Sequence, residues 1–209
     1  MEARGSYVAG PADAESSRGL RGGTGTIFSD GEDAVVKCMK LSNNPMHLVK
    51  VLCELIVGFL IPEDSACLCP VREAWIESPG GACEVLYTRM PRFAGDLVDL
   101  INLSHGKKME VSSDLAEYVA AGTLRAMHEL ASVLGPRGCH SDLKLDNIMI
   151  DGDGNVRVID YGHARSEKFL DRRMRLLAWR PMEPFESGSK ADSWSVAMLM
   201  VVMISSKCR

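Results

Sequence analysis

HSDLKLDNIMIDGDGNVRVIDYG, residues 140–162, is the segment that carries the strongest indication of the fold. It holds two short apolar runs, 148–150 and 156–159, which are separated by the turn-forming residues DGDGN. Short β-branched runs on either side of an Asp-Gly turn are typical of a β-hairpin. Because a hairpin brings its two ends together, we expect Asn147 and Asp160 to face one site.

The polar residues around this hairpin are of the kinds that phosphoryl chemistry requires. Two oxygen ligands at adjacent strand ends, Asn147 and Asp160, suit Mg²⁺, which prefers a few protein oxygens together with substrate phosphates. The carboxylate of Asp142 lies just upstream of them and could accept a proton from an attacking hydroxyl. The stretch therefore predicts a metal and phosphate site.

The same residues resemble the catalytic loop and the metal-binding motif of the protein kinase superfamily, usually written HRDLKxxN and DFG. The resemblance implies that Asp142 is the catalytic base and that Lys144 steadies the transferred phosphoryl group. It also implies that Asn147 and Asp160 hold Mg²⁺. A lysine two residues after the aspartate is the serine/threonine form of the loop. A hairpin with incidental surface acids would not match five polar identities at fixed offsets.

Two positions in the stretch depart from the family pattern. Ser141 replaces the arginine of HRD, and Tyr161 replaces the phenylalanine of DFG. The second change is mild. The first removes the cation that usually binds a phosphate on the activation loop, so the sequence does not support control by phosphorylation of that loop.

Two further family motifs precede the catalytic stretch. In the glycine-rich segment 19–28, the pattern GxGxxGxV keeps Gly22, Gly25 and Ile27, although Leu20 stands at its first glycine. Glycines let backbone N–H groups close over phosphates without a Cβ in the way. The resemblance therefore makes this segment the nucleotide-binding loop, with a glycine-rich linker as the alternative.

An apolar run at 34–36 ends in Lys37 and resembles the strand motif VAIK, which implies that Lys37 binds the α- and β-phosphates of ATP. An apolar helix is predicted at 50–61, stopped by Pro62. Glu54 is the only acid in it, and the family pairs a glutamate of this helix with the strand lysine. Glu63, which lies beyond the proline, is the alternative partner.

The segment 87–92 is the hinge between two lobes by the same resemblance. Its backbone would bind the adenine, and Met90 is the residue we expect to do so. It follows strands predicted at 71–76 and 84–90, which are joined by a Pro-Gly-Gly turn. ATP and Mg²⁺ are thus the implied cofactors.

The implied fold class is α+β, a two-lobed protein kinase-like fold with a small β-rich N-terminal lobe and a helical C-terminal lobe. The lobes are predicted at 19–90 and 91–209, after a disordered segment at 1–18 that is small and polar. A helix predicted at 113–134 has one apolar face and would pack beneath the catalytic loop.

The remaining family motifs lie near the C-terminus. Segment 163–182 has the length of an activation segment, and Glu183 stands at the glutamate of the pattern that ends it, although the usual threonine is missing. The sequence DSWSV resembles the start of the buried central helix, where Asp192 would cap backbone amides under the catalytic loop. The lobe is truncated after this helix, because the chain ends at Arg209. We therefore expect exposed apolar surface, and a protein partner or dimer that covers it.

Composition limits the class of protein. The 209 residues suffice for one core or two small lobes, and 46% hydrophobic with 25% charged residues is typical of a globular chain. A net charge of -4 does not favour nucleic-acid binding. The longest apolar run, 196–204, is far shorter than the roughly 20 residues of a membrane span, and no secretory signal is recognisable. Seven scattered cysteines favour a reducing intracellular setting, the cytoplasm or the nucleus.

The predicted function is that of an ATP-dependent serine/threonine protein kinase acting on a protein substrate. Its compactness is similar to that of kinases carried by large DNA viruses, which would place it in a host cell. A pseudokinase or decoy that binds a partner is the alternative; Ser141 and the short lobe support it, and the retained Lys37, Asp142 and Asp160 oppose it. A small atypical kinase would not be expected to carry WRPMEP and DSWS.

Overall fold

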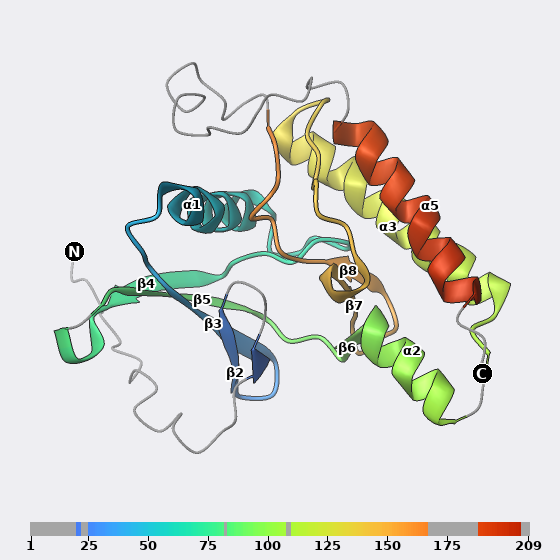
Figure 1. Cartoon of the computed structure of the whole chain (residues 1–209), viewed down its shortest axis with the longest axis horizontal. Coiled ribbons are helices and arrows are strands. Elements are labelled where there is room, and N and C mark those ends of the chain that lie inside the picture. The colour runs from blue at the N-terminus through green and yellow to red at the C-terminus, as the bar shows by residue number, and fades with distance from the viewer. Residues whose placement is uncertain (1–19, 22–24, 82, 108–109, 167–187, 206–209) are drawn as a thin grey trace.

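The computed structural model describes residues 20–21, 25–81, 83–107, 110–166 and 188–205 (Figure 1). The predictions for segment 1–18, Gly22, Glu183 and most of the activation segment lie outside these residues. Within them, an antiparallel sheet and one long helix form the first lobe, and helices around a small second sheet form the other. The predicted two-lobed α+β class is confirmed, whereas the lobe boundaries remain predictions.

The first lobe is built on a five-stranded sheet in the order β1-β2-β3-β5-β4. The strands are β1 (Leu20–Arg21), β2 (Thr26–Asp30), β3 (Ala34–Lys40), β4 (Glu73–Glu77) and β5 (Val85–Pro91). β3 pairs with β5 in a register that sets Lys37 opposite Thr88. A short 3₁₀ turn, η2 (Pro79–Gly81), joins β4 to β5 as predicted. β3 is longer than the predicted strand, because its pairing with β5 continues to Lys40.

Helix α1 (Pro45–Leu60) covers one face of this sheet (Figure 1). It begins at Pro45, ahead of the predicted start at Lys50. The side chain of Asn44 accepts a hydrogen bond from the amide of Met46 at 3.0 Å, and proline at the first helical position needs no N–H partner. Val51 packs with two residues of the sheet, Met39 and Leu86. This packing fixes α1 against β3 and β5.

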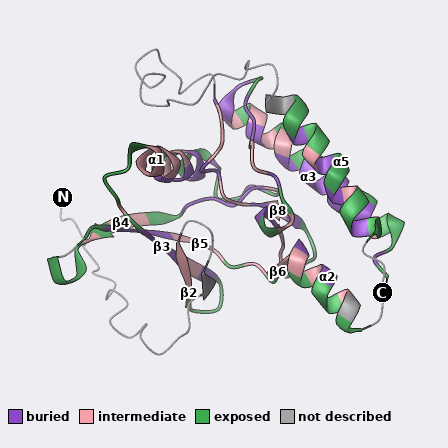
Figure 2. Ribbon diagram, in the orientation of Figure 1, coloured by how far each residue is buried: buried purple, intermediate pink, exposed green. Residues whose placement is uncertain are grey.

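The second lobe contains helices α2 (Leu97–Gly106), α3 (Ser113–Leu134) and α5 (Gly188–Ser205). α3 has the predicted bounds. The side chain of Ser112 accepts a hydrogen bond from the amide of Leu115 at its start, and Gly135, with φ 103°, ends it. α3 and α5 lie side by side (Figure 1), and their buried residues face each other in Figure 2. The main core contains Leu130, Leu134, Val196, Leu199 and Met203 from these two helices.

The predicted hairpin is confirmed as β7 (Ile148–Ile150) and β8 (Val156–Val158), which pair antiparallel. The carboxylate of Asp151 closes the turn by accepting hydrogen bonds from the amides of Asp153 and Asn155, at 3.0 and 2.8 Å. A short strand, β6 (Gly95–Asp96), extends the sheet on the β7 side. β6 was not predicted, because two residues carry no periodic pattern.

The described residues contain no helix that is long and apolar enough to cross a membrane.

Candidate active site

A buried ion pair joins the two main elements of the first lobe. The ammonium of Lys37, on β3, donates a hydrogen bond to Oε1 of Glu54, on α1. Burial raises the pKa of Glu54, the attraction of Lys37 opposes this rise, and the negative charge of Asp160 adds to it. The pair therefore lies within electrostatic reach of Asp160 in the second lobe. The predicted Lys37–Glu54 contact is present, and Glu63 lies outside α1.

Asp192 holds the catalytic loop from below, as predicted. Its two carboxylate oxygens accept hydrogen bonds from the amides of His140, at 2.7 Å, and Ser141, at 2.9 Å. Ser141 has φ 63°, a conformation that few residues other than glycine adopt. The two hydrogen bonds stabilise this strained turn of the loop, which places Asp142 next in the chain.

His140 connects the catalytic loop to the end of β8. Its ring nitrogen Nδ1 accepts a hydrogen bond from the amide of Asp142 at 3.3 Å, so Nε2 carries the proton and donates to the carbonyl of Ile159 at 2.9 Å. Burial lowers the pKa of His140, so the neutral ring is the favoured form. One buried side chain thus sets the spacing between Asp142 and Asp160.

Asp142 has several donors around one of its carboxylate oxygens. Oδ2 lies 3.3 Å from Nζ of Lys144, 3.3 Å from Nδ1 of His163 and 3.4 Å from Nδ2 of Asn147. Partial burial raises the pKa of Asp142, but Lys144 and His163 outweigh it and lower the pKa below its usual value. Asp142 is therefore a carboxylate at neutral pH. Its Oδ1 has no hydrogen bond within the described part of the chain.

Asn147 closes the catalytic loop on the other side. It is buried, and its Nδ2 donates to the carbonyl of Asp142 at 2.8 Å, which leaves its Oδ1 as a potential metal ligand. Its own carbonyl accepts a hydrogen bond from the amide of Ile159 at 3.1 Å. Asn147 is thereby tied to the residue next to Asp160, as the hairpin predicted.

The conformation around Asp160 is set by the tyrosine that follows it. Asp160 has φ 66°, and its Oδ1 accepts only a long contact of 3.4 Å from the amide of Gly162. Tyr161 is buried, and its hydroxyl donates to the carbonyl of Val158 at 2.7 Å and accepts from the amide of Cys69 at 2.9 Å. These bonds hold the tyrosine inward and so fix the backbone that orients Asp160. No sequence pattern predicts these bonds, because Cys69 lies 92 residues before Tyr161.

The remaining predicted nucleotide-binding residues lie around β2, β3 and β5. A Cβ on Gly25 would lie 2.4 Å from the carbonyl oxygen of Cys38, so only glycine lets this segment lie against β3. Ile27 pairs with Lys37 across β2 and β3. Met90 lines a small cavity together with Glu54 and Asp160.

The side-chain oxygens of Asn147 and Asp160 are suitable ligands for a hard divalent cation. Within the described residues, Oδ1 of Asn147 and Oδ2 of Asp160 accept no hydrogen bond, and the two residues are tied together through Ile159. Mg²⁺ is bound through one or two protein oxygens plus phosphates and water, and the two side chains supply that number. In the described residues, no group of three or more His, Cys, Asp or Glu side chains forms another metal cluster.

A family model for the protein kinase domain matches residues 84–208. The chain belongs to the protein kinase family. Among its curated relatives, the serine/threonine-protein kinase pakC of Dictyostelium discoideum is 28% identical over 141 residues, covering 63% of this chain and 26% of that protein. The NUAK family SNF1-like kinase 2 of Homo sapiens is 28% identical over 118 residues, 53% of this chain and 18% of the relative. This chain thus spans about a quarter or less of the length of these relatives.

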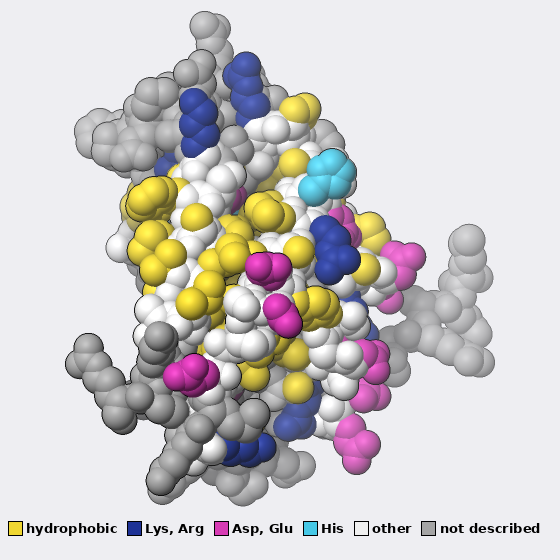
Figure 3. Space-filling model, turned by 90° about the vertical axis from the view of Figure 1, so that its right-hand side faces the viewer, with side chains coloured by type: hydrophobic (Ala, Val, Ile, Leu, Met, Phe, Trp, Pro, Cys, Tyr) yellow, Lys and Arg dark blue, Asp and Glu magenta, His cyan; other side chains and the backbone are white. Residues whose placement is uncertain are grey.

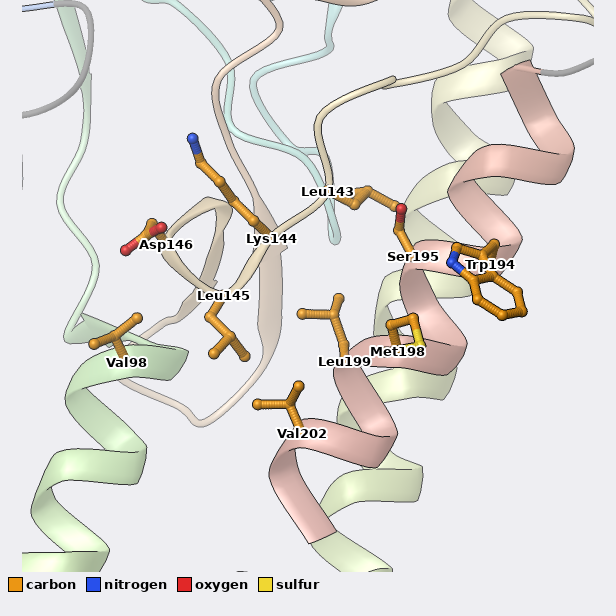
Figure 4. Close-up of a pocket in the computed structure, with 10 residues that line it drawn as sticks. All are labelled: Val98, Leu143, Lys144, Leu145, Asp146, Trp194, Ser195, Met198, Leu199 and Val202. Atoms are coloured by element: carbon orange, nitrogen blue, oxygen red, sulfur yellow. The ribbon is translucent and has the colours of Figure 1, made fainter. Parts of the chain in front are cut away.

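This protein kinase chain also has an apolar hollow of about 380 Å³ on the side of the catalytic loop that faces α5 (Figure 4). Figure 4 shows Leu145 of the loop, Val98 of α2 and Val202 of α5 directed toward this space, whereas the ammonium of Lys144 points away from it. Trp194 and Met198 lie at its edge on α5. Asp142 itself does not line this hollow, although its neighbours Leu143 and Lys144 do.

Proposed function

We propose that the chain is an active, ATP-dependent serine/threonine protein kinase that transfers the γ-phosphoryl group of ATP to a hydroxyl group of a protein substrate. The observation that supports this proposal is the ionisation and the hydrogen bonding of the Asp142 carboxylate. Its pKa is lowered and one of its oxygens is held by neighbouring donors. The other oxygen accepts no hydrogen bond from the described residues, which leaves it for a substrate hydroxyl. Positioning and electrostatic stabilisation supply most of the rate in such a transfer.

In the proposed mechanism, Asp142 Oδ1 accepts the hydrogen bond, and then the proton, of the attacking hydroxyl. The ammonium of Lys144, which is half exposed beside Asp142, offsets negative charge on the transferring group. Lys37, oriented by Glu54, binds the α- and β-phosphates. Mg²⁺, when bound by Asn147 and Asp160, would neutralise phosphate charge.

The nucleotide is expected to lie between the two lobes. The backbone around Gly25, and Gly22 before it, would cover the phosphates, with Ile27 beside them. The segment 25–27 is held next to β3 by the close approach of Gly25 to Cys38. Lys37 immediately precedes Cys38 on β3, so this close approach places the loop next to the proposed phosphate-binding lysine.

The register of β3 and β5 decides how Met90 contributes. The hydrogen bond of 3.0 Å from the amide of Arg92 to the carbonyl of Asp33 marks the end of their ladder. Hydrogen-bonded pairs alternate with non-bonded pairs in antiparallel strands, so Val35 and Met90 form the next bonded pair. The amide of Met90 is therefore engaged by β3, which leaves its side chain as the group that we propose contributes to the nucleotide site.

We accordingly assign the adenine contacts to the residues after Met90. By the same alternation, the carbonyl of Pro91 points away from β3, toward an edge that β4 leaves uncovered after its pair with Arg89. We assign the amide of Phe93, two residues after Pro91, to the same edge. These two groups offer one acceptor and one donor, the pair that the polar edge of adenine requires.

A pseudokinase that binds a partner remains the second candidate. Ser141 favours it, because the loop lacks the arginine cation of the family motif. A protein partner or a second copy of the chain on the exposed face of α5 would fit either function. We further propose a location in the cytoplasm or the nucleus, based on the cysteine pattern of the sequence, with no specific nucleic-acid or membrane partner.

The first prediction concerns turnover itself. With Mg²⁺, the purified chain is expected to phosphorylate a generic protein substrate, whereas Asp142→Ala and Asp160→Ala lose about 100-fold or more of this activity. Radiolabelled phosphate transfer is the measurement, with the thermal stability of each variant as the folding control. Wild-type activity no higher than that of the variants contradicts the enzyme proposal. Thermal stabilisation by ATP without turnover would then support the pseudokinase.

A further inference from the structure

His163 is a residue of the active site to which the family motifs gave no role. It lies after Gly162, in a turn closed by a hydrogen bond of 2.9 Å from the amide of Ala164 to the carbonyl of Tyr161. Two residues later, Arg165 exchanges backbone hydrogen bonds of 2.9 and 3.1 Å with Cys139. His163 is thus anchored on both sides, by the buried tyrosine and by the bridge between Arg165 and Cys139, which directly precedes the catalytic loop.

This anchored ring contacts the proposed catalytic base. Nδ1 of His163 lies 3.3 Å from Oδ2 of Asp142, and the histidine side chain is only 24% exposed. A carboxylate oxygen is an acceptor, so the contact requires a proton on Nδ1. Both the neutral Nδ1–H ring and the imidazolium satisfy this requirement.

The other two donors at this oxygen are less suited to hold it. Lys144 is 48% exposed on a flexible stem, and during transfer its ammonium is expected to turn toward the phosphoryl group. The Nδ2 of Asn147 is 3.4 Å from Oδ2 but 2.8 Å from the carbonyl of Asp142, so its main bond goes to the backbone. When Lys144 turns away, His163 is the main side-chain donor left to Oδ2.

We propose that His163 is a positioning residue for phosphoryl transfer. Its Nδ1–H holds Oδ2 of Asp142, so that Oδ1 faces the substrate hydroxyl. The terminal torsion of an aspartate is broad, and a fixed donor on one oxygen removes this rotational freedom before the reaction. The proposal rests on the proposed function, in which Asp142 accepts the proton of the hydroxyl.

The test compares three variants at the same position. His163→Leu removes the donor, His163→Asn places an amide nitrogen near the position of Nδ1, and His163→Gln places it one bond further away. We expect His163→Leu to lower kcat between about 10-fold and 100-fold, with KM for ATP and Tm close to those of the wild type. His163→Asn should keep kcat within a few-fold of the wild type, and His163→Gln should not. Unchanged kcat in His163→Leu, or equal loss in all three variants, overturns the proposal.

A second measurement does not depend on turnover. Long-range ¹H–¹⁵N NMR of histidine-labelled protein reports which ring nitrogen carries a proton, and His163→Leu identifies the signal. We expect a proton on Nδ1, and a change of this signal in Asp142→Ala. An Nε2-protonated ring that does not respond to Asp142→Ala refutes the contact. A wild-type chain without turnover refutes the proposed function alone, and the NMR result then decides on the His163 contact.

Discussion

Among single residues, Tyr161 has a hydroxyl that stabilises the backbone next to Asp160 through two buried hydrogen bonds. We predict that Tyr161→Phe lowers the free energy of unfolding by about 0.5–1.5 kcal/mol, the usual contribution of one buried hydrogen bond. A larger loss is not expected, because the amide of Cys69 also donates to the carbonyl of Val158, at 3.0 Å. Urea unfolding of the two proteins measures the difference.

Tyr118→Phe is the matched control for this change. The hydroxyl of Tyr118 donates to the carbonyl of Gly154 at 3.2 Å, but the side chain is 43% exposed, so water can replace the lost partner. Tyr118→Phe should therefore lower the free energy of unfolding clearly less than Tyr161→Phe does. Equal losses in the two variants would mean that the buried hydroxyl does not stabilise the turn before Gly162.

The contacts of a single residue could be predicted where its partner is close in sequence or belongs to a recognisable family motif. Asp142 and Asn147 followed from their fixed spacing in one loop, and the contact of Lys37 with Glu54 followed from a family pairing between two recognisable elements. The contact between His163 and Asp142 could not be predicted, because it depends on how the turn after Asp160 returns to the catalytic loop. No spacing rule connects residues across such a return.

At the scale of elements, the contact between α3 and β8 supports the hairpin that carries Asn147 and Asp160. We predict that Gly122→Ala lowers the free energy of unfolding by about 1–3 kcal/mol, because the new methyl group would lie 2.7 Å from Cβ of Val156 on β8. The helix or the hairpin must then shift. Urea unfolding gives the free energy, and kinase activity at a temperature well below Tm reports whether the hairpin has moved.

Gly106→Ala, at the end of α2, is the control for helix propensity. Apart from its chain neighbours and its own helix backbone, no atom of the described residues lies within 4 Å of a Cβ at this position. Alanine should therefore leave stability unchanged or raise it by up to about 1 kcal/mol. If both alanine variants raise stability, α3 is not in tight contact with β8.

Elements differed in how well the sequence specified them. α3 was predicted with its bounds, because a long apolar periodicity is flanked by Ser112 and Gly135, which cap its two ends. The start of α1 was placed too late, because its first turn is specified by the cap at Asn44 rather than by apolar spacing. β6 is stable only through its pairing with β7, so its two residues contain no local signal.

At the scale of the whole molecule, the outer face of α5 is apolar where it lies at the surface. Figure 3 shows hydrophobic side chains gathered on the side of the molecule where α5 lies. The exposed large apolar residues in the described part of this helix are Trp194, Met198, Val201, Val202 and Ile204. Such faces favour contact with another protein surface. In a concentrated solution of the purified chain, the available surface is a second copy.

We therefore predict concentration-dependent self-association that Trp194→Glu reduces. The Trp194 residue is 69% exposed, so the substitution should change the free energy of unfolding by no more than about 0.5 kcal/mol. Leu199→Glu, on the buried side of the same helix and 7% exposed, should instead unfold the second lobe, because a carboxylate would enter the core without a partner. Size-exclusion chromatography with light scattering over a range of concentrations measures the mass of each protein. A monomeric wild type whose Tm falls in Trp194→Glu would show that this indole stabilises its own chain rather than a contact between chains.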